Sequence, residues 1–229
     1  MYSRTVAGSG ALLLLLLAPA AAQAVPTIQP LKPCYVTADT SSGPQAEGVA
    51  ISAAGFTPNS TVTLTIDGAP VDGGQSLQTD TAGALTLPPV PAPFVRSGSH
   101  DFTITLTEDG NPANTVSATS RSTALGVRIR PIEAAPSDLV RFRGLGFTKD
   151  KAIYAHYIYK GSVRKTVRMA RRPRSDCGAF RARRRQIPVR NPRLGRWTIQ
   201  FDQSRRFVDP SETPIVFVRI GIRLRLVPV

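Results

Sequence analysis

Three short motifs occur twice in this chain, in the same order and at nearly constant separation. The first copies are residues 51–57, 80–85 and 98–104, and the second copies are residues 142–148, 176–180 and 195–199, offset by 91 to 97 positions. Both copies contain Gly-Phe-Thr, then Asp followed closely by Gly, then Gly shortly before Thr-Ile. Three matches in one order indicate two copies of a single folding unit of about 90–100 residues.

Between these motifs, apolar and polar residues alternate with a period of two. Val62, Leu64 and Ile66 are separated by threonines, and residues 196–202 and 216–226 alternate in the same way. Alternation of this kind predicts strands with one buried face, and no stretch has the apolar period of a helix. The sequence therefore predicts an all-β fold of two tandem β-sandwiches, each with about seven short strands.

Glycines provide the expected turns. The Asp-x-x-Gly element predicts a turn in which Gly83, and Gly178 in the second copy, take a positive φ. The aromatic residue of each Gly-Phe pair is expected to close one end of its sandwich. Three further dipeptides predict tight connections between strands: Asp67-Gly68, Asp109-Gly110 and Lys160-Gly161.

Residues 55–68, Gly-Phe-Thr-Pro-Asn-Ser-Thr-Val-Thr-Leu-Thr-Ile-Asp-Gly, resemble the Gly-Phe-x-Pro-x-Ser-x-Val-x-Val motif of bacterial immunoglobulin-like domains in exported actinobacterial proteins. The resemblance covers residues 45–107, and residues 136–202 are similar but more divergent. It implies two tandem immunoglobulin-like β-sandwiches. Such domains serve mostly as spacers, adhesive modules or carbohydrate-binding modules, and the resemblance carries over no catalytic residue.

Residues 1–24 have the pattern of a secretory signal peptide. Arg4 precedes a short apolar run, and Ala22-Gln23-Ala24 forms a small-x-small cleavage site. The apolar run is too short for a membrane-spanning helix. We expect the mature chain to be exported, without a transmembrane span, and to be secreted or associated with the cell envelope. An uncleaved N-terminal anchor is the alternative.

The charge of the chain is concentrated in its second half. Lys and Arg outnumber Asp and Glu by 29 to 15, for a net charge of +14. Residues 25–124 carry a net charge of −5, whereas residues 125–229 have 25 basic and seven acidic residues and carry +18. This change predicts an acidic domain at residues 25–120 and a strongly basic domain at 125–229, joined by a linker at 120–124. Because the chain is predicted to be exported, intracellular nucleic acid is not an expected partner.

Two arginine-rich runs flank the Asp176-Cys177-Gly178 turn, and we expect them to face each other across a hairpin. Arginine binds phosphate, sulfate and carboxylate groups through two hydrogen bonds at once. The runs therefore predict a polyanion-binding surface, to which Tyr154, Tyr157 and Tyr159 would add aromatic area. The candidate binding residues are Arg164, Lys165, Arg168, Arg171, Arg172, Arg174, Arg181, Arg183, Arg184 and Arg185.

The abundance of arginine also has interpretations that involve no polyanion. The chain has 24 Arg and only five Lys, a bias that GC-rich codon usage also produces. Positive charges on edge strands also prevent strands from aggregating. In addition, the acidic half can dock on the basic half, within one molecule or between molecules.

The two cysteines, Cys34 and Cys177, are one per predicted domain. In an exported protein an even pair suggests a disulfide, which would join the two domains. The alternative is a pair of distant free thiols.

Catalytic and metal-binding residues are not evident. His100 is expected in a surface loop and His156 in a strand, where a lone histidine is more often a packed or solvated residue than a catalytic base. Asp67, Asp72, Asp80 and Asp109 lie near turns, where turn hydrogen bonding accounts for them better than calcium binding. No cofactor is expected.

These observations predict a non-enzymatic exported binding or adhesion module whose second domain contacts an anionic cell-envelope polymer. The alternative is a structural spacer or assembly module that binds another envelope protein, and a secreted enzyme on a β scaffold is a third. The oligomeric state is left open.

Overall fold

The structure, a computed structural model, describes residues 25–40, 42–71, 76–207 and 215–223. The signal peptide predicted at residues 1–24 lies outside the described residues. The described part contains no α-helix, so the predicted all-β class is confirmed. The strands of the first half are β1 (Thr27–Ile28), β2 (Tyr35–Thr40), β3 (Gly43–Ala46), β4 (Gly48–Ala54), β5 (Thr61–Ile66), β6 (Ala69–Pro70), β7 (Ser76–Gln78), β8 (Leu85–Pro91), β9 (Ser99–Glu108) and β10 (Asn111–Ala124). The strands of the second half are β11 (Gly126–Arg130), β12 (Leu139–Leu145), β13 (Ile153–Tyr159), β14 (Ser162–Ala170), β15 (Phe180–Arg185), β16 (Gly195–Asp202) and β17 (Val216–Ile222).

Each half consists of two sheets with matching strand orders. In the first half, β1-β4-β8 forms one sheet and β3-β2-β10-β9-β5-β6 the other, with β7 also paired to β5. In the second half, β11-β12-β15 forms one sheet and β14-β13-β16-β17 the other. The order β10-β9-β5 corresponds to β17-β16-β13, and β1-β4-β8 corresponds to β11-β12-β15. The β2–β3 hairpin is an addition to the first half.

Apolar side chains fill the space between the two sheets of each half. In the first half, Ile51 of β4 and Ile104 of β9 belong to one buried cluster. The second half has the larger aromatic core, in which Phe142 of β12 and Phe180 of β15 pack against Phe201 of β16, with ring centroids 5.8 Å and 6.3 Å from that of Phe201. In strands such as β12, burial of one face leaves the opposite face free for polar and charged residues.

The three predicted tight connections are confirmed. Asp67-Gly68 connects β5 to β6, Asp109-Gly110 connects β9 to β10, and Lys160-Gly161 connects β13 to β14. All three glycines have positive φ, and so do Asp67 and Lys160. At Asp67-Gly68 and Lys160-Gly161, where both residues have positive φ, this is the backbone of a type I′ hairpin loop.

The paired Gly and Phe motifs make the same close contact in both halves. The N–H of Phe56 donates to the carbonyl of Gly83 over 3.2 Å, and the N–H of Phe147 donates to the carbonyl of Gly178 over 3.2 Å. Both glycines have positive φ, and a Cβ at either would lie within 2.0 to 2.2 Å of the phenylalanine backbone. Both phenylalanines are buried. The two motifs therefore interlock, and only glycine fits there.

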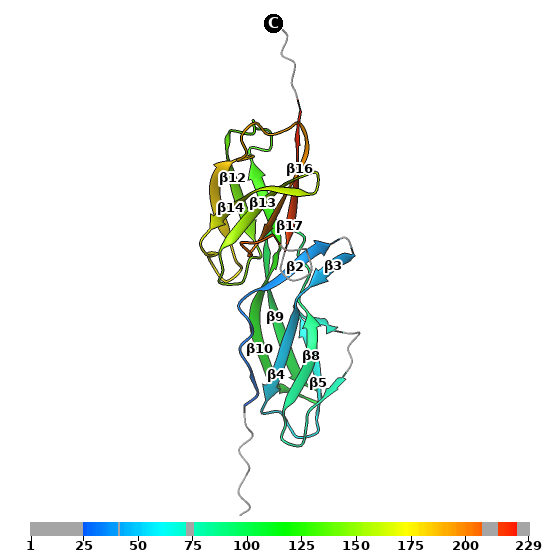
Figure 1. Cartoon of the computed structure of the whole chain (residues 1–229). Coiled ribbons are helices and arrows are strands. Elements are labelled where there is room, and N and C mark those ends of the chain that lie inside the picture. Colours follow the sequence, from blue (N-terminus) through cyan, green and yellow to red (C-terminus); the bar gives the residue numbers. More distant parts are fainter. Residues whose placement is uncertain (1–24, 41, 72–75, 208–214, 224–229) are drawn as a thin grey trace, which may run out of the picture.

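The two halves lie end to end, with the described chain beginning at one end and finishing at the other (Figure 1). The linker expected at residues 120–124 is wrong: this segment is the last part of β10, where residues Ser122 to Ala124 pair in parallel with β2. Only Leu125 separates β10 from β11, and its N–H donates to the carbonyl of Thr37 over 2.7 Å. A disulfide between Cys34 and Cys177 makes a second covalent connection between the halves, with Cα atoms 5.2 Å apart.

We predict that Gly178→Ala destabilises the second half far more than Gly161→Ala. Both glycines have positive φ, so alanine costs about 1–2 kcal/mol of backbone energy at either position. At Gly161 a Cβ meets nothing within 4 Å, whereas at Gly178 it meets the Phe147 backbone. We therefore expect a total loss above about 3 kcal/mol for Gly178→Ala. Denaturant unfolding followed by Trp197 fluorescence measures both, since Trp197 is the chain's one tryptophan and is buried in the second half. Equal losses would contradict the interlock.

Candidate polyanion-binding surface

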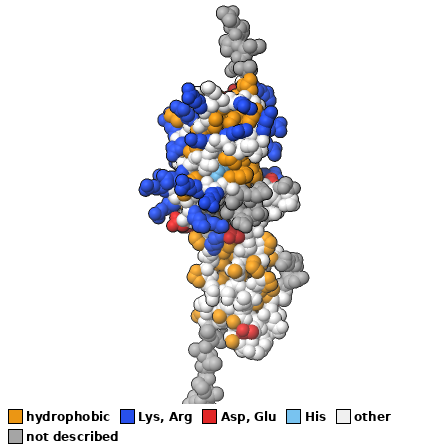
Figure 2. All heavy atoms as spheres, in the orientation of Figure 1, with side chains coloured by type: hydrophobic (Ala, Val, Ile, Leu, Met, Phe, Trp, Pro, Cys, Tyr) orange, Lys and Arg blue, Asp and Glu red, His pale blue; other side chains and the backbone are white. Residues whose placement is uncertain are grey.

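Basic side chains cover much of the visible surface of the second half and are scarce on the first (Figure 2). Among the described residues, four ion pairs occur: Lys32–Glu47, His100–Asp67, Arg121–Asp101 and His156–Asp202. None of these includes an Arg or Lys of the described part of the second half. The guanidinium groups there are exposed and are not neutralised by neighbouring carboxylates.

The ten predicted binding residues are all exposed, but they do not form a hairpin. Arg164, Lys165 and Arg168 lie on β14, which pairs with β13. The arginines at 181 and 183–185 lie on β15, which pairs with β12 in the other sheet. The expectation that the two runs face each other across a hairpin is wrong, because the chain crosses from one sheet to the other between them. Each run lies on an edge strand, and β14 and β15 are in contact.

The connection from β14 to β15 contains Arg171, Arg172 and Arg174. It closes with reciprocal backbone hydrogen bonds between Arg174 and Ala179, at 2.6 Å and 2.7 Å. The carbonyl of Cys177 accepts from the N–H of Gly146 over 2.9 Å, and its sulfur is bonded to Cys34. The disulfide therefore holds these three arginines close to the junction of the two halves.

The sheet that contains β15 has four further exposed arginines that the sequence-based prediction did not include: Arg128, Arg130, Arg141 and Arg143. They lie on β11 and β12, and their neighbours Ile129 and Phe142 point into the core. The strand register aligns these residues in two rows across β11, β12 and β15. One row is Arg128, Arg143 and Arg181, and the other is Arg130, Arg141 and Arg183. All six are exposed. We call this set of six residues, in two rows of three, the arginine ladder.

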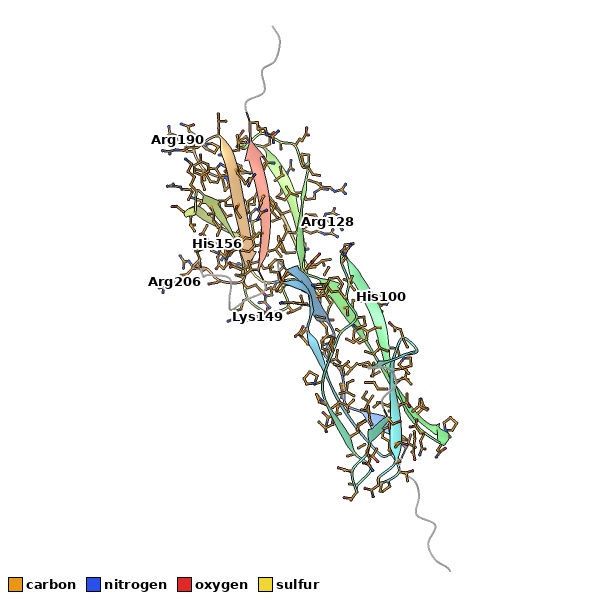
Figure 3. The ribbon with its side chains drawn as sticks, turned by 90° about the vertical axis from the view of Figure 1, so that its right-hand side faces the viewer. His100, Arg128, Lys149, His156, Arg190 and Arg206 are labelled. Carbon is orange, nitrogen blue, oxygen red and sulfur yellow. A yellow bond between two sulfur atoms is a disulfide. The ribbon has the colours of Figure 1, made fainter. Side chains whose placement is uncertain are left out.

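A sequence signal for the ladder exists in the Arg-x-Arg spacing of residues 128–130, 141–143 and 181–183. In a strand this spacing places both arginines of a pair on one face. The rows themselves depend on which strands pair and in which register. Figure 3 shows Arg128 on one side of the second half, with Arg190 and Arg206 on the other, so the positive charge extends over more than one face.

Two of the three tyrosines expected to add surface are buried. Tyr157 and Tyr159 are 0% and 8% exposed, and Tyr154 is half-buried. Burial raises the pKa of the Tyr157 phenol well above its usual value. The aromatic contribution predicted for the binding surface is therefore wrong for Tyr157 and Tyr159, because both point into the core on the inner face of β13.

The two histidines are in different surroundings. His100 is exposed on β9, with Nε2 3.5 Å from a carboxylate oxygen of Asp67. His156 is fully buried on β13, where Nδ1 lies 2.9 Å from Oγ1 of Thr166 and Nε2 lies 3.3 Å from Oδ1 of Asp202. Nε2 also lies 3.2 Å from the carbonyl oxygen of Ser204, and the ring of Phe207 packs edge-on against the imidazole.

Asp202 has several hydrogen-bond donors in this buried cluster. It accepts from the Gln200 amide over 2.8 Å and from the Ser204 N–H over 2.8 Å, in addition to its contact with His156. Burial alone would raise the pKa of Asp202, but these hydrogen bonds outweigh it and hold the pKa below its ordinary value. The arrangement anchors the segment after β16 to the sheet.

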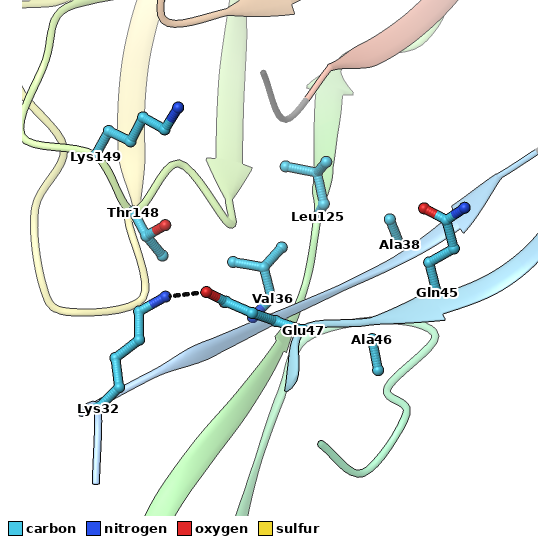
Figure 4. A pocket seen from close by; sticks show the side chains of 9 residues that line it. All are labelled: Lys32, Val36, Ala38, Gln45, Ala46, Glu47, Leu125, Thr148 and Lys149. Atoms are coloured by element: carbon cyan, nitrogen blue, oxygen red, sulfur yellow. Dashed lines mark hydrogen bonds and ion pairs between the residues drawn. The ribbon is translucent and has the colours of Figure 1, made fainter. Parts of the chain in front are cut away.

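A cleft of about 580 Å³ lies where the halves meet (Figure 4). Its apolar side chains include Val36 and Leu125, and Lys32 forms an ion pair with Glu47 at its rim. The nine lining residues are Lys32, Val36, Ala38, Gln45, Ala46, Glu47, Leu125, Thr148 and Lys149. None of the ten predicted binding residues and none of the ladder residues lines this cleft.

Asp80 makes the side-chain hydrogen bonds expected of a turn, whereas the Asp67 side chain binds the backbone of β9 and Asp72 lies outside the described residues. Oδ1 of Asp80 accepts from the N–H groups of Ala82 and Ala84, both over 2.8 Å. Oδ1 of Asp67 accepts from the Thr103 N–H over 2.8 Å. Within the described ranges, no group of three or more His, Cys, Asp or Glu side chains could hold a metal ion. Nor does any helix there have the length and apolar character needed to cross a membrane.

Neither a protein-family model nor a curated protein matches this sequence. Among solved structures, the chain is similar to the crystal structure of a tetra-tandem repeat in the extending region of a large adhesion protein. The identity is 12% and the TM-score is 0.29, over 83% of this chain and 49% of that one. The match thus spans about half the length of that solved chain.

We predict that the buried Asp202 makes stability depend on pH in the acid range. A carboxyl whose pKa is lowered on folding contributes stability above its unfolded pKa of about 4, and this is lost as the pH falls through the folded value. Asp202→Asn should lower the stability at pH 7 and make the second half less sensitive to pH below about 4. Unfolding followed by Trp197 fluorescence at several pH values tests this. An acid dependence as steep in the variant as in the natural chain would contradict it.

Proposed function

We propose that this chain is an exported, non-enzymatic binding module whose basic second half contacts anionic polymers of the cell envelope. The observation that carries the proposal is the unbalanced charge of the second half. Its described guanidinium groups are exposed and form no ion pairs with carboxylates. Such a surface attracts polyanions and releases their counterions, so its binding weakens steeply as salt is added.

The same proposal includes the domain type and the location. Two sheets around one core, repeated with matching strand order, support tandem immunoglobulin-like β-sandwiches as the sequence resemblance implies. The Cys34–Cys177 disulfide supports an oxidising compartment, and hence export. Full burial of His156 supports a structural role for the His156–Asp202 pair.

We predict that the full chain is retained on immobilised heparin at moderate salt and elutes as salt is raised. Replacing Arg171, Arg172, Arg174, Arg183, Arg184 and Arg185 by Ser should weaken binding by at least about tenfold, because six exposed charges are removed. Arg96→Ser, which removes an exposed arginine of the first half, is the control and should have little effect. Elution at low salt that the six substitutions leave unchanged would refute the proposal.

A spacer role is the second candidate, and the disulfide favours it. The halves lie end to end, and the Cys34–Cys177 bond encloses most of the described chain, with a sequence separation of 143 residues. A load applied to the two ends therefore passes through the disulfide and bypasses the strands between the two cysteines. The partner of such a spacer would be another envelope protein.

Pulling the full chain by its two ends tests the spacer role. With the disulfide intact, the residues between the cysteines should release no length, whereas reduction or Cys34→Ser/Cys177→Ser should add about 50 nm of extension. Equal extensions for the oxidised chain and the serine variant would show that the disulfide does not carry the load.

A further inference from the structure

The arginine ladder is a regular array. Neighbouring strands lie about 4.8 Å apart, and alternate residues along a strand lie about 7 Å apart. Each row of three arginines therefore spans about 10 Å of the sheet, and the second row follows about 7 Å further along the strands. Because β11, β12 and β15 direct Ile129, Phe142 and Ala182 inward, the six arginines share the outer face of one sheet.

The scaffold does not require arginine at these positions. Like charges directly opposite each other destabilise a sheet, and the ladder sets three in each row. In the corresponding sheet of the first half, Ser52 of β4 lies opposite Thr86 of β8, and the N–H of Gln29 donates to the carbonyl of Ser52. These three uncharged residues occupy the places of Arg128, Arg143 and Arg181. The same architecture thus forms without the charges.

Codon usage does not account for the ladder, and protection against aggregation accounts only for its four arginines on the edge strands β11 and β15. Codon usage acts on the whole gene, yet residues 25–124 contain two arginines, Arg96 and Arg121. Protection against aggregation needs charge on edge strands. Arg141 and Arg143 lie on β12, the central strand of its sheet. A ligand accounts for the array better than either.

The chemistry of the face indicates the kind of ligand. Guanidinium forks match the oxygens of sulfate and phosphate groups and bind them through paired hydrogen bonds. The aromatic residues of these three strands, Phe142 and Phe180, are both buried, so the face has no aromatic surface on which the bases of a single-stranded nucleic acid could stack. A polysaccharide with charged ester groups needs no such stacking.

We propose that the arginine ladder is the binding site for an extended polysaccharide that carries sulfate or phosphate ester groups. This inference rests on the proposed function and specifies the site and ligand class within it. The polymer lies on the open face of the β11-β12-β15 sheet, and its ester groups bind to arginines of adjacent strands. The arginines of residues 171–174 and of β14 contribute general attraction.

The test compares two triple variants of the full, oxidised chain that remove the same charge. The ladder variant is Arg128→Gln/Arg143→Gln/Arg181→Gln, and the matched control is Arg171→Gln/Arg172→Gln/Arg174→Gln. Affinity for a heparin oligosaccharide at fixed salt should fall at least about tenfold in the ladder variant, or 1.4 kcal/mol. In the control it should fall about twofold to threefold. A third variant, with Lys at the three ladder positions, keeps the charge and should lie between the ladder variant and the natural chain, because lysine lacks the paired donors.

Each outcome is informative. Equal losses in the two triple variants would overturn the ladder as the site and leave the proposed function standing. Absence of heparin binding by the natural chain would overturn both.

Two further probes test the ligand class: a phosphorylated mannan, and hyaluronan, whose only charged groups are carboxylates. Binding to hyaluronan as tight as binding to heparin would overturn the preference for sulfate or phosphate esters. Tighter binding to duplex DNA than to either ester-bearing glycan would overturn the polysaccharide assignment. Thermal unfolding checks the fold, and the ladder variant should be at least as stable as the natural chain because like charges are removed.

Discussion

Burial of aromatic side chains between the two sheets of the second half determines the rest of its surface. Phe142 and Phe180 on one sheet pack against Phe201 on the other. Because side chains alternate along a strand, every buried residue of β12 and β15 directs its neighbour outward. The register that serves the core therefore also aligns the arginines of three strands in rows. A shift of one residue would bury the charges, so the array is as well defined as the core itself.

The same architecture serves two different surfaces. The first half uses matching strand orders and the same Gly–Phe interlock, but its equivalent sheet presents uncharged residues such as Ser52 and Thr86. Charge can differ so much because the outer face of a sheet contributes little to the core. The Cys34–Cys177 disulfide and the nearly continuous passage from β10 to β11 hold the charged and uncharged halves together. Under the proposed function, the second half is the one that binds.

Local patterns in the sequence predicted the local structure well. Alternation at residues 62–66 and 196–202 indicated strands, and Lys160-Gly161 indicated a hairpin loop, because both signals depend on neighbouring residues only. The change in charge near residue 124 wrongly predicts a linker at residues 120–124, because charge indicates where the halves differ and not whether the chain there forms a strand. In the structure Ser122 and Thr123 are buried where β10 pairs with β2. That pairing joins segments 87 residues apart, and nothing in either segment indicates it.

The sequence alone indicates only part of the candidate site, because it shows which residues are neighbours along the chain but not which strands pair. The arginine runs at 164–174 and 181–185 are evident because their members lie close together in sequence, whereas the ladder combines pairs of arginines from three separate segments.

The most direct test of binding at the ladder is an NMR titration that follows the Nε–Hε signals of the arginines as a sulfated oligosaccharide is added. We expect the largest and earliest changes at the six ladder arginines. Changes concentrated at Arg171, Arg172 and Arg174, or spread evenly over all arginines, would contradict binding at the ladder.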